Sequence, residues 1–202
     1  CPHYLTLSDE VFEPANGFEA AKFVCSPPMR DRSHSEALWR ALESGSVQQV
    51  ASDHAPFRFG DQKTLGRDDF TRIPNGLPGI ETRIPLLFTN GVTTDRISAS
   101  RFVELVSTNP AKIFGMYPEK GSLDIGADAD LVVIDPEGEV TIDHESLHSA
   151  MDYSPYQGMR VSGFPTWTIS RGEVIVENGK PLATRGRGQP VRRSRIDPKR
   201  LP

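Results

Sequence analysis

The stretch VASDHAPF, residues 50–57, places an acid and a histidine, Asp53 and His54, directly after a short apolar run. The segment before it, SVQQVAS, residues 46–52, reads as a strand, so Asp53 lies at the expected carboxyl end of that strand. Catalytic groups gather at this end of barrel-type strands, and a carboxylate there can hold a divalent metal and take a proton from water. The alternative is structural, with Asp53 capping a loop and His54 held by its neighbours.

The sequence around this strand indicates an α/β unit. SHSEALWRALESG, residues 33–45, has helical periodicity, with Ser33 or Ser35 as the cap of the helix. Residues 59–83 are rich in Gly, Pro and charge, and a loop of this length is typical of a functional segment. The further helices that we expect are residues 100–107 and 109–115.

A small β domain is predicted to begin near residue 118. DADLVVIDP, residues 128–136, reads as a strand with turn residues on both sides. TWTISRGEVIVENGKPL, residues 166–182, contains two strands joined by an Arg171-Gly172 turn and followed by an Asn178-Gly179 turn signal.

The composition, with 37% hydrophobic and 25% charged residues, is typical of a soluble globular protein. No apolar run approaches the roughly 20 residues of a membrane span. Two cysteines provide no disulfide framework, which favours the cytoplasm. Neither Cys1 nor Cys25 has a recognisable base as partner, so we expect both thiols to be inert. The start without Met leads us to expect a processed or truncated product.

Charge is distributed unevenly along the chain. Residues 183–202 hold seven Lys/Arg and one Asp, a net charge of +6, whereas the part before them carries −10. A basic tail attracts phosphates, so nucleic-acid binding is one interpretation. The tail has no aromatic residue on which bases could stack. We therefore expect a solvated or subunit-contacting tail and no nucleic-acid partner.

Three other segments have both a functional and a structural interpretation. HESLH, residues 144–148, matches the HExxH pattern of zinc proteases, but helix-breaking sequence follows it, which favours a polar turn or short helix. CSPPMR, residues 25–30, and IPNGLPG, residues 73–79, are stiff turns by default. Each could instead present backbone groups to a ligand, in the first case at Ser26.

Several segments together resemble the C-terminal part of dihydropyrimidinases and bacterial D-hydantoinases, in the cyclic-amidohydrolase superfamily. They are CPHYL, ASDHAPF, IPNGLPGIETR, STNPAKIFG and MDYSPYQG, in this order. Allantoinases and dihydroorotases share the SDH element, but IPNGLPGIETR and DYSPYQG are more similar to the hydantoinase branch. The resemblance implies an α/β fold. Residues 1–117 would be the C-terminal portion of a (β/α)8 metal-dependent hydrolase barrel, 118–182 the C-terminal part of a β-sandwich, and 183–202 a basic tail.

The resemblance also implies a reaction, which is hydrolysis of the ring amide bond of 5,6-dihydropyrimidines or 5-substituted hydantoins by a metal-bound hydroxide. Two divalent metal ions, commonly zinc, would be bridged by a carboxylated lysine. Asp53 matches the position that binds one metal and carries the proton to the leaving nitrogen. Ser26 and Asn75 match positions whose backbone groups bind the substrate ring. His54 is expected beside the metal ligand and not as a ligand. The family's homotetramer implies subunit contacts through the C-terminal region.

The other metal ligands implied by the resemblance have no match in these 202 residues. They are an HxH pair, the carboxylated lysine and two single histidines. We therefore expect the isolated chain to be an incomplete and inactive part of the hydrolase. The alternatives are a non-catalytic hydantoinase-like structural or regulatory protein, or an allantoinase or dihydroorotase type of hydrolase.

Overall fold

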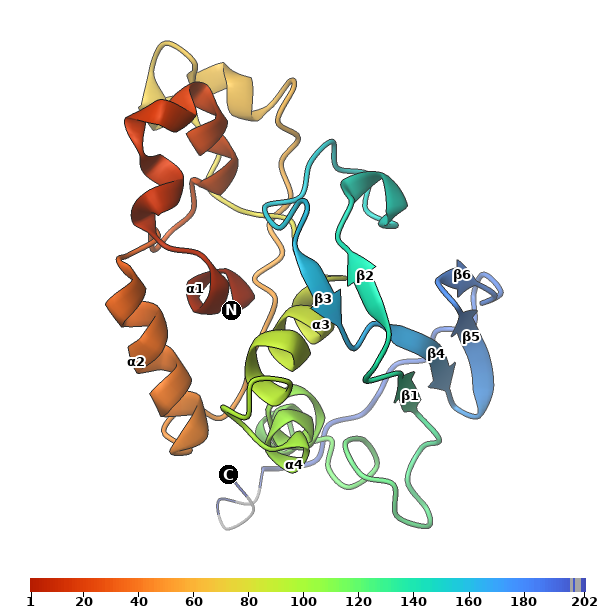
Figure 1. Cartoon of the computed structure of the whole chain (residues 1–202). Coiled ribbons are helices and arrows are strands. Elements are labelled where there is room, and N and C mark those ends of the chain that lie inside the picture. The colour runs from red at the N-terminus through yellow and green to blue at the C-terminus, as the bar shows by residue number, and fades with distance from the viewer. Residues whose placement is uncertain (197, 199–200) are drawn as a thin grey trace.

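The computed structural model describes residues 1–196, 198 and 201–202. Figure 1 shows the helices of the first half of the chain on one side and the strands of the second half on the other. The last helix of the first half ends at Ile113, and the first strand begins at Leu131. The domain boundary near residue 118 stays a prediction.

The helical elements are short, and two of them, η5 and η6, are π-helical, whereas the other η elements are 3₁₀ helices. In chain order they are α1 (Pro2–Thr6), η1 (Asp9–Phe12), η2 (Pro14–Phe23), α2 (Arg32–Glu43), η3 (Lys63–Gly66), η4 (Phe70–Arg72), α3 (Arg83–Leu87), η5 (Phe88–Val92), α4 (Ala99–Val103), η6 (Glu104–Thr108), α5 (Asn109–Ile113) and η7 (His144–Ser146). The strands are β1 (Leu131–Ile134), β2 (Glu139–Thr141), β3 (Arg160–Ser162), β4 (Pro165–Ser170), β5 (Glu173–Glu177) and β6 (Lys180–Pro181).

Helix α2 confirms the helix predicted over residues 33–45, with a different cap. The side chain of Asp31, and not Ser33 or Ser35, caps the helix by accepting a 2.9 Å hydrogen bond from the backbone N–H of Ser33. A short carboxylate one position before the first helical residue satisfies an N–H that has no partner within the helix. The apolar side of α2 packs against α1, where the indole N–H of Trp39 donates to the carbonyl of Leu5 at 3.1 Å.

The strand predicted over residues 46–52 is wrong. Within the described part of the chain these residues form no ladder, and the only pairing nearby is a parallel bridge between His54 and Leu77. A strand needs a continuous row of backbone partners. Here the N–H of Val50 donates instead to the carbonyl of Leu105, in a helix, at 3.2 Å. Asp53 therefore follows an irregular segment that meets the 74–77 segment at one point.

The two helices predicted over residues 100–107 and 109–115 form one helical run through α4, η6 and α5. Ser98 caps it, because its side chain accepts a hydrogen bond from the N–H of Arg101. Gly115 follows the run with a φ of +70°, a conformation that glycine adopts without strain. The run buries Phe102 and Leu105 in the core that also contains α1 and α2.

The strands form two antiparallel sheets, one with the order β1-β4-β5-β6 and one that pairs β2 with β3. Both predicted turns are confirmed. Arg171 and Gly172 have φ of +49° and +76°, and Asn178 and Gly179 have +47° and +75°. Two successive positive φ values match the right-handed twist of a two-residue hairpin.

Part of the basic tail lies against the rest of the chain. The guanidinium of Arg187 binds Glu173, and the N–H of Ser194 donates to the carbonyl of Gly115 at 2.8 Å. Residues 197, 199 and 200, which belong to the predicted tail, lie outside the described residues. Across the part that the structure describes, no helix combines the length and the apolar character that a membrane span requires.

Candidate active site

Asp53 is an exposed carboxylate with an unusual backbone conformation. Its φ is +50°, in the left-handed region that residues with a side chain seldom adopt. The bridge between His54 and Leu77 and the hydrogen bond from the N–H of Ala55 to the carbonyl of Leu77, at 3.1 Å, hold the next residues in place. A strained residue that its neighbours hold fixed is typical of a functional position.

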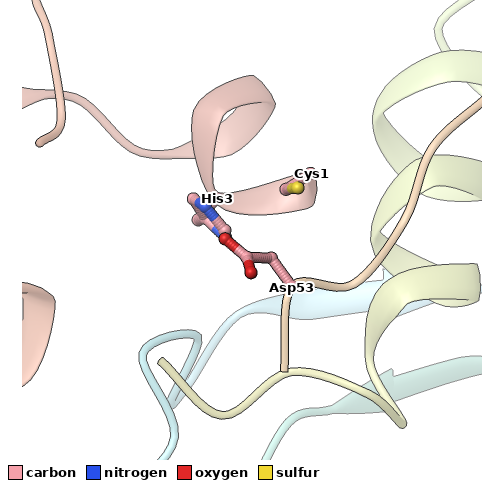
Figure 2. Close-up of side chains that lie close together, drawn as sticks. All are labelled: Cys1, His3 and Asp53. Carbon is pink, nitrogen blue, oxygen red and sulfur yellow. The ribbon is translucent and has the colours of Figure 1, made fainter. Parts of the chain in front are cut away.

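Three possible metal ligands meet at Asp53. One ligand atom each from Cys1, His3 and Asp53 lie within 4.8 Å of one another. Figure 2 shows the His3 ring and the Asp53 carboxylate facing each other, with Cys1 beside them at the start of α1. The fold thus brings an imidazole and a carboxylate close to Cys1, whereas the expectation that its thiol is inert stays a prediction.

The His3 side chain is buried, with 1% of its surface exposed, and its Nε2 atom has no hydrogen-bond partner. Burial and, to a smaller extent, the nearby N-terminal ammonium lower the pKa of His3 to about 4, although the Asp53 carboxylate opposes them. The imidazole is therefore neutral near pH 7, which is the form that binds metals. A buried nitrogen without a partner usually costs free energy, and a bound water or a metal ion would satisfy this atom.

The donor set fits one divalent ion. A thiolate, an imidazole and a carboxylate are all common zinc ligands, and three protein ligands leave an open fourth position, as in catalytic zinc sites. The described residues contain this single group of three metal-binding side chains. Cys1, His3 and Asp53 thus provide donors for one metal, whereas the two-metal site remains a prediction.

The two residues predicted to bind substrate lie together although they are 49 positions apart. The hydroxyl of Ser26 donates to the Oδ1 atom of Asn75 at 3.2 Å. The segments that carry them are joined by a 3.0 Å hydrogen bond from the N–H of Gly76 to the carbonyl of Val24. The fold thus brings both stiff turns, residues 25–30 and 73–79, to one place.

A lysine that the sequence did not suggest joins these two segments. Lys63 has no exposed surface, and its Nζ donates to the carbonyls of Val24 at 2.9 Å and Pro74 at 2.7 Å. Burial lowers the pKa of Lys63 to about 8. Lysine in a polar loop normally predicts a solvated side chain, so no local signal could have identified this role.

His54 supports the same region. Its Nδ1 atom accepts hydrogen bonds from the backbone N–H groups of Gly79 at 3.0 Å and Ile80 at 3.3 Å. These bonds attach the residue after Asp53 to the far end of the 73–79 turn. They give His54 a structural task, and its place beside a metal ligand stays a prediction.

The HESLH segment is not a zinc-protease helix. It forms only the short 3₁₀ turn η7, and the Nδ1 atom of His148 binds Glu81 at 2.8 Å. Among the described residues, neither His144 nor His148 belongs to a group of three metal-binding side chains. The interpretation as a polar turn is confirmed.

Comparison with known proteins shows what the chain resembles. The sequence profile of the amidohydrolase family matches residues 8–175. A D-hydantoinase from Geobacillus stearothermophilus is 48% identical over 195 residues, which are 96% of this chain and 41% of the relative. A D-phenylhydantoinase from Escherichia coli O81 (strain ED1a) is 42% identical and covers 98% of this chain. The chain thus spans about two fifths of the length of these relatives.

Solved structures agree with these similarities. A crystal structure of D-hydantoinase superposes with a TM-score of 0.92 at 46% identity, over 96% of this chain and 42% of that one. A dihydropyrimidinase from Brevibacillus agri NCHU1002 superposes with a TM-score of 0.86 at 46% identity, over 90% of this chain and 39% of that one. The predicted fold class, the C-terminal part of a metal-dependent hydrolase barrel with part of a β-sandwich, is confirmed.

Proposed function

Because the chain belongs to the amidohydrolase family, we propose that it is part of an enzyme that hydrolyses the ring amide bond of 5-substituted hydantoins or 5,6-dihydropyrimidines. The observation that carries the proposal is similarity to D-hydantoinases along 96% of the chain, at 48% identity in one relative. The convergence of Ser26, Asn75 and the segment that carries Asp53 supports it.

Asp53 is proposed to bind the metal and to move the proton. Its carboxylate is exposed and next to two further donors, so it can hold a divalent metal with one oxygen and a proton with the other. Such a metal supplies Lewis acidity and makes water acidic enough to attack near neutral pH. Asp53 then accepts a proton from the attacking water and delivers it to the leaving ring nitrogen.

Ser26 and Asn75 are proposed to orient the ring. Both residues are accessible, and the hydrogen bond between their side chains joins the two backbone segments. Backbone N–H and C=O groups held in this way can pair with the alternating carbonyl and amide groups of a hydantoin or dihydropyrimidine edge. A ring bound at both edges presents its amide carbon to water in one orientation, which lowers the entropic part of the barrier.

The finer assignments belong to the same proposal. They are a pair of divalent ions, with zinc as the metal, a bridging carboxylated lysine from another part of the enzyme, a homotetramer with contacts through the C-terminal region, and a cytoplasmic location. The amidohydrolase family as a whole supports divalent-metal dependence. The small cyclic amide is the proposed partner of the site.

The test is hydrolysis by the full-length enzyme that contains this sequence, with dihydrouracil, hydantoin, D- and L-phenylhydantoin, allantoin and dihydroorotate as substrates. Asp53→Asn is expected to lower kcat by about 100-fold or more, because it removes the proton carrier. Asp95→Asn is the matched control, since Asp95 is also an exposed aspartate with a positive φ, +57°. Turnover of allantoin or dihydroorotate alone, or full activity in Asp53→Asn, would contradict the proposal.

A further inference from the structure

We infer that Lys63 is a positioning residue that acts through the Pro74–Asn75 peptide, where it orients the Asn75 N–H and strengthens it as a donor to a ligand carbonyl. The inference rests on the proposed function, because a cyclic amide is the proposed ligand of this site. It adds a residue that neither the sequence nor the family resemblance assigned to substrate binding. The effect on the Asn75 N–H is measured without turnover, so the two proposals can fail separately.

Lys63 acts on Asn75 through one peptide unit. The Nζ atom of Lys63 donates to the carbonyl of Pro74 at 2.7 Å, and this carbonyl belongs to the same peptide unit as the Asn75 N–H. Hydrogen bonds in a chain polarise one another, so an N–H becomes a better donor when its own peptide carbonyl accepts a bond. A charged donor is roughly twice as effective as a neutral one. Although burial lowers the pKa of Lys63 to about 8, the amine is protonated near pH 7.

The Asn75 N–H is available for a ligand. Among the hydrogen bonds that the described residues form, this N–H donates to no acceptor, and Asn75 is exposed. The polar groups around it are already in use, because the N–H of Gly76 donates to the carbonyl of Val24 at 3.0 Å and the Asn75 Oδ1 atom accepts from Ser26. The turn therefore keeps one polarised N–H free, beside the other proposed substrate-binding residue.

Lys63 itself is held firmly enough to fix the direction of this peptide. Its backbone N–H donates to the carbonyl of Arg58 at 2.9 Å. Gly66, in the same helix η3, lies so close to the residue before Pro74 that an added Cβ would be 2.7 Å from the backbone nitrogen of Ile73. Proline also has a fixed φ, which limits rotation of the backbone at this point. The ammonium group and the carbonyl that it binds are therefore held at both ends.

This role predicts a specific kinetic effect. A donor that binds the ring away from the bond under attack holds the substrate and the transition state equally well. Its loss raises KM and leaves kcat unchanged. A lysine that served folding alone would instead change the amount of active enzyme, which lowers the apparent kcat at constant KM. The two constants thus separate a positioning role from a structural one.

The first experiment observes the peptide directly by NMR, in the chain labelled with ¹³C at proline carbonyls and with ¹⁵N at asparagine. Pro74–Asn75 is the only Pro-Asn pair in the sequence, so a carbon-detected carbonyl–nitrogen correlation contains one signal. Lys63→Met should move the carbonyl resonance to lower frequency, because a bond from a cation deshields the carbonyl carbon. Lys180→Met, at an exposed lysine, is the control and should leave the signal in place. A signal that Lys63→Met does not move would overturn the inference.

The same signal tests the unaltered chain if Lys63→Met does not fold. As pH rises from about 6 to 10, the carbonyl resonance should move to lower frequency with a midpoint of about 8, as the ammonium group loses its proton. The Cys25 thiol is the titratable neighbour that acts on Lys63, and burial raises its pKa above that of a free thiol. Cys25→Ser should therefore keep the transition. A signal that stays constant over this pH range would also overturn the inference.

The second experiment measures kinetics in the full-length enzyme that contains this sequence, at pH 7 and at a temperature where every variant is folded. Lys63→Met should raise KM for hydantoin and dihydrouracil by about 10-fold and change kcat by less than about 2-fold. Asp152→Asn is the control for lost stability and should change neither constant, because Asp152 binds the loop at Phe59 and Gly60 instead of Pro74.

The outcomes distinguish this inference from the proposed hydrolase. A lower kcat at unchanged KM in Lys63→Met would overturn the positioning role and leave the hydrolase proposal intact. If the enzyme hydrolyses no cyclic amide, the hydrolase proposal fails. A carbonyl signal that moves in Lys63→Met and with pH then still supports the action of Lys63 on the Asn75 N–H.

Discussion

The Nζ atom of Lys63 donates a 2.7 Å hydrogen bond to the carbonyl oxygen of Pro74, the residue before Asn75. The same Nζ binds the carbonyl of Val24, two residues before Ser26. One buried ammonium group thus connects the backbone of both proposed substrate-binding turns.

Replacement of Lys63 by Met should destabilise the chain by about 1–3 kcal/mol, because the partly buried carbonyl of Pro74 loses its donor. Lys180→Met, at an exposed lysine in β6, is the control and should have almost no effect. Urea titration measures the free energy of unfolding of both variants and of the unaltered chain. Equal unfolding midpoints for the two variants would show that Lys63 does not hold the turns together.

Stability should rise with pH above about 8 because of Lys63. Burial lowers its pKa in the folded chain to about 8, whereas an unfolded lysine has a pKa of about 10.4. Between these values the unfolded chain binds more protons, so each added pH unit favours the folded state by at most about 1.4 kcal/mol. Urea unfolding at several pH values between about 7 and 10 should show this slope in the unaltered chain and not in Lys63→Met. Parallel curves would mean that Lys63 titrates normally.

A methyl group at Gly76 should separate the segments of Asp53 and Asn75. Gly76 has a φ of +147°, and an added Cβ would lie 2.4 Å from the carbonyl oxygen of Ala55. We expect Gly76→Ala to destabilise the chain by about 2 kcal/mol or more, since backbone atoms must move apart. Gly188→Ala is the control, because no atom lies within 4 Å of its added Cβ. Thermal unfolding of both variants measures the difference, and similar melting temperatures would contradict the predicted clash.

Asp152 should stabilise the start of the long loop, residues 59–83. Its carboxylate accepts hydrogen bonds from the N–H groups of Phe59 at 2.7 Å and Gly60 at 2.8 Å. Partial burial would raise its pKa, but these two bonds outweigh burial and hold the pKa of Asp152 below its usual range. Asp152→Asn should cost about 1 kcal/mol, a small value because the side chain is exposed and water screens its charge.

The pH dependence gives this variant a second test. A carboxyl with a lowered folded pKa stabilises the chain above its unfolded pKa, and the effect is lost as pH falls through the folded value. The stability deficit of Asp152→Asn should therefore be fully present near neutral pH and should shrink in acid, as urea unfolding at several pH values can show. Asp124→Asn, at an exposed aspartate, is the control and should show neither the deficit nor its pH dependence. If the stability deficit of Asp152→Asn stays constant as the pH falls, it comes from changed packing of the side chain and not from its charge.

Local patterns predicted the elements whose stability comes from neighbouring residues. The apolar period of residues 33–45 identified α2, and two pairs of turn residues, Arg171-Gly172 and Asn178-Gly179, identified the hairpins. The order of the motifs also led to the correct family and to Asp53 as the expected metal ligand. The prediction over residues 46–52 failed because a strand exists only where another segment supplies a ladder, and apolar alternation alone cannot say whether it does.

The sequence by itself therefore determined α2, the helical run from α4 to α5, the two hairpin turns and the family, because each depends on residue type and spacing over a few positions. The tertiary structure alone decided that Cys1 and His3 lie beside Asp53, about 50 residues away, and that Lys63 is buried between two turns. Such contacts depend on how distant segments pack against one another. Their free energies come from burial and from pairing with groups that are not neighbours in the chain, so no local pattern records them.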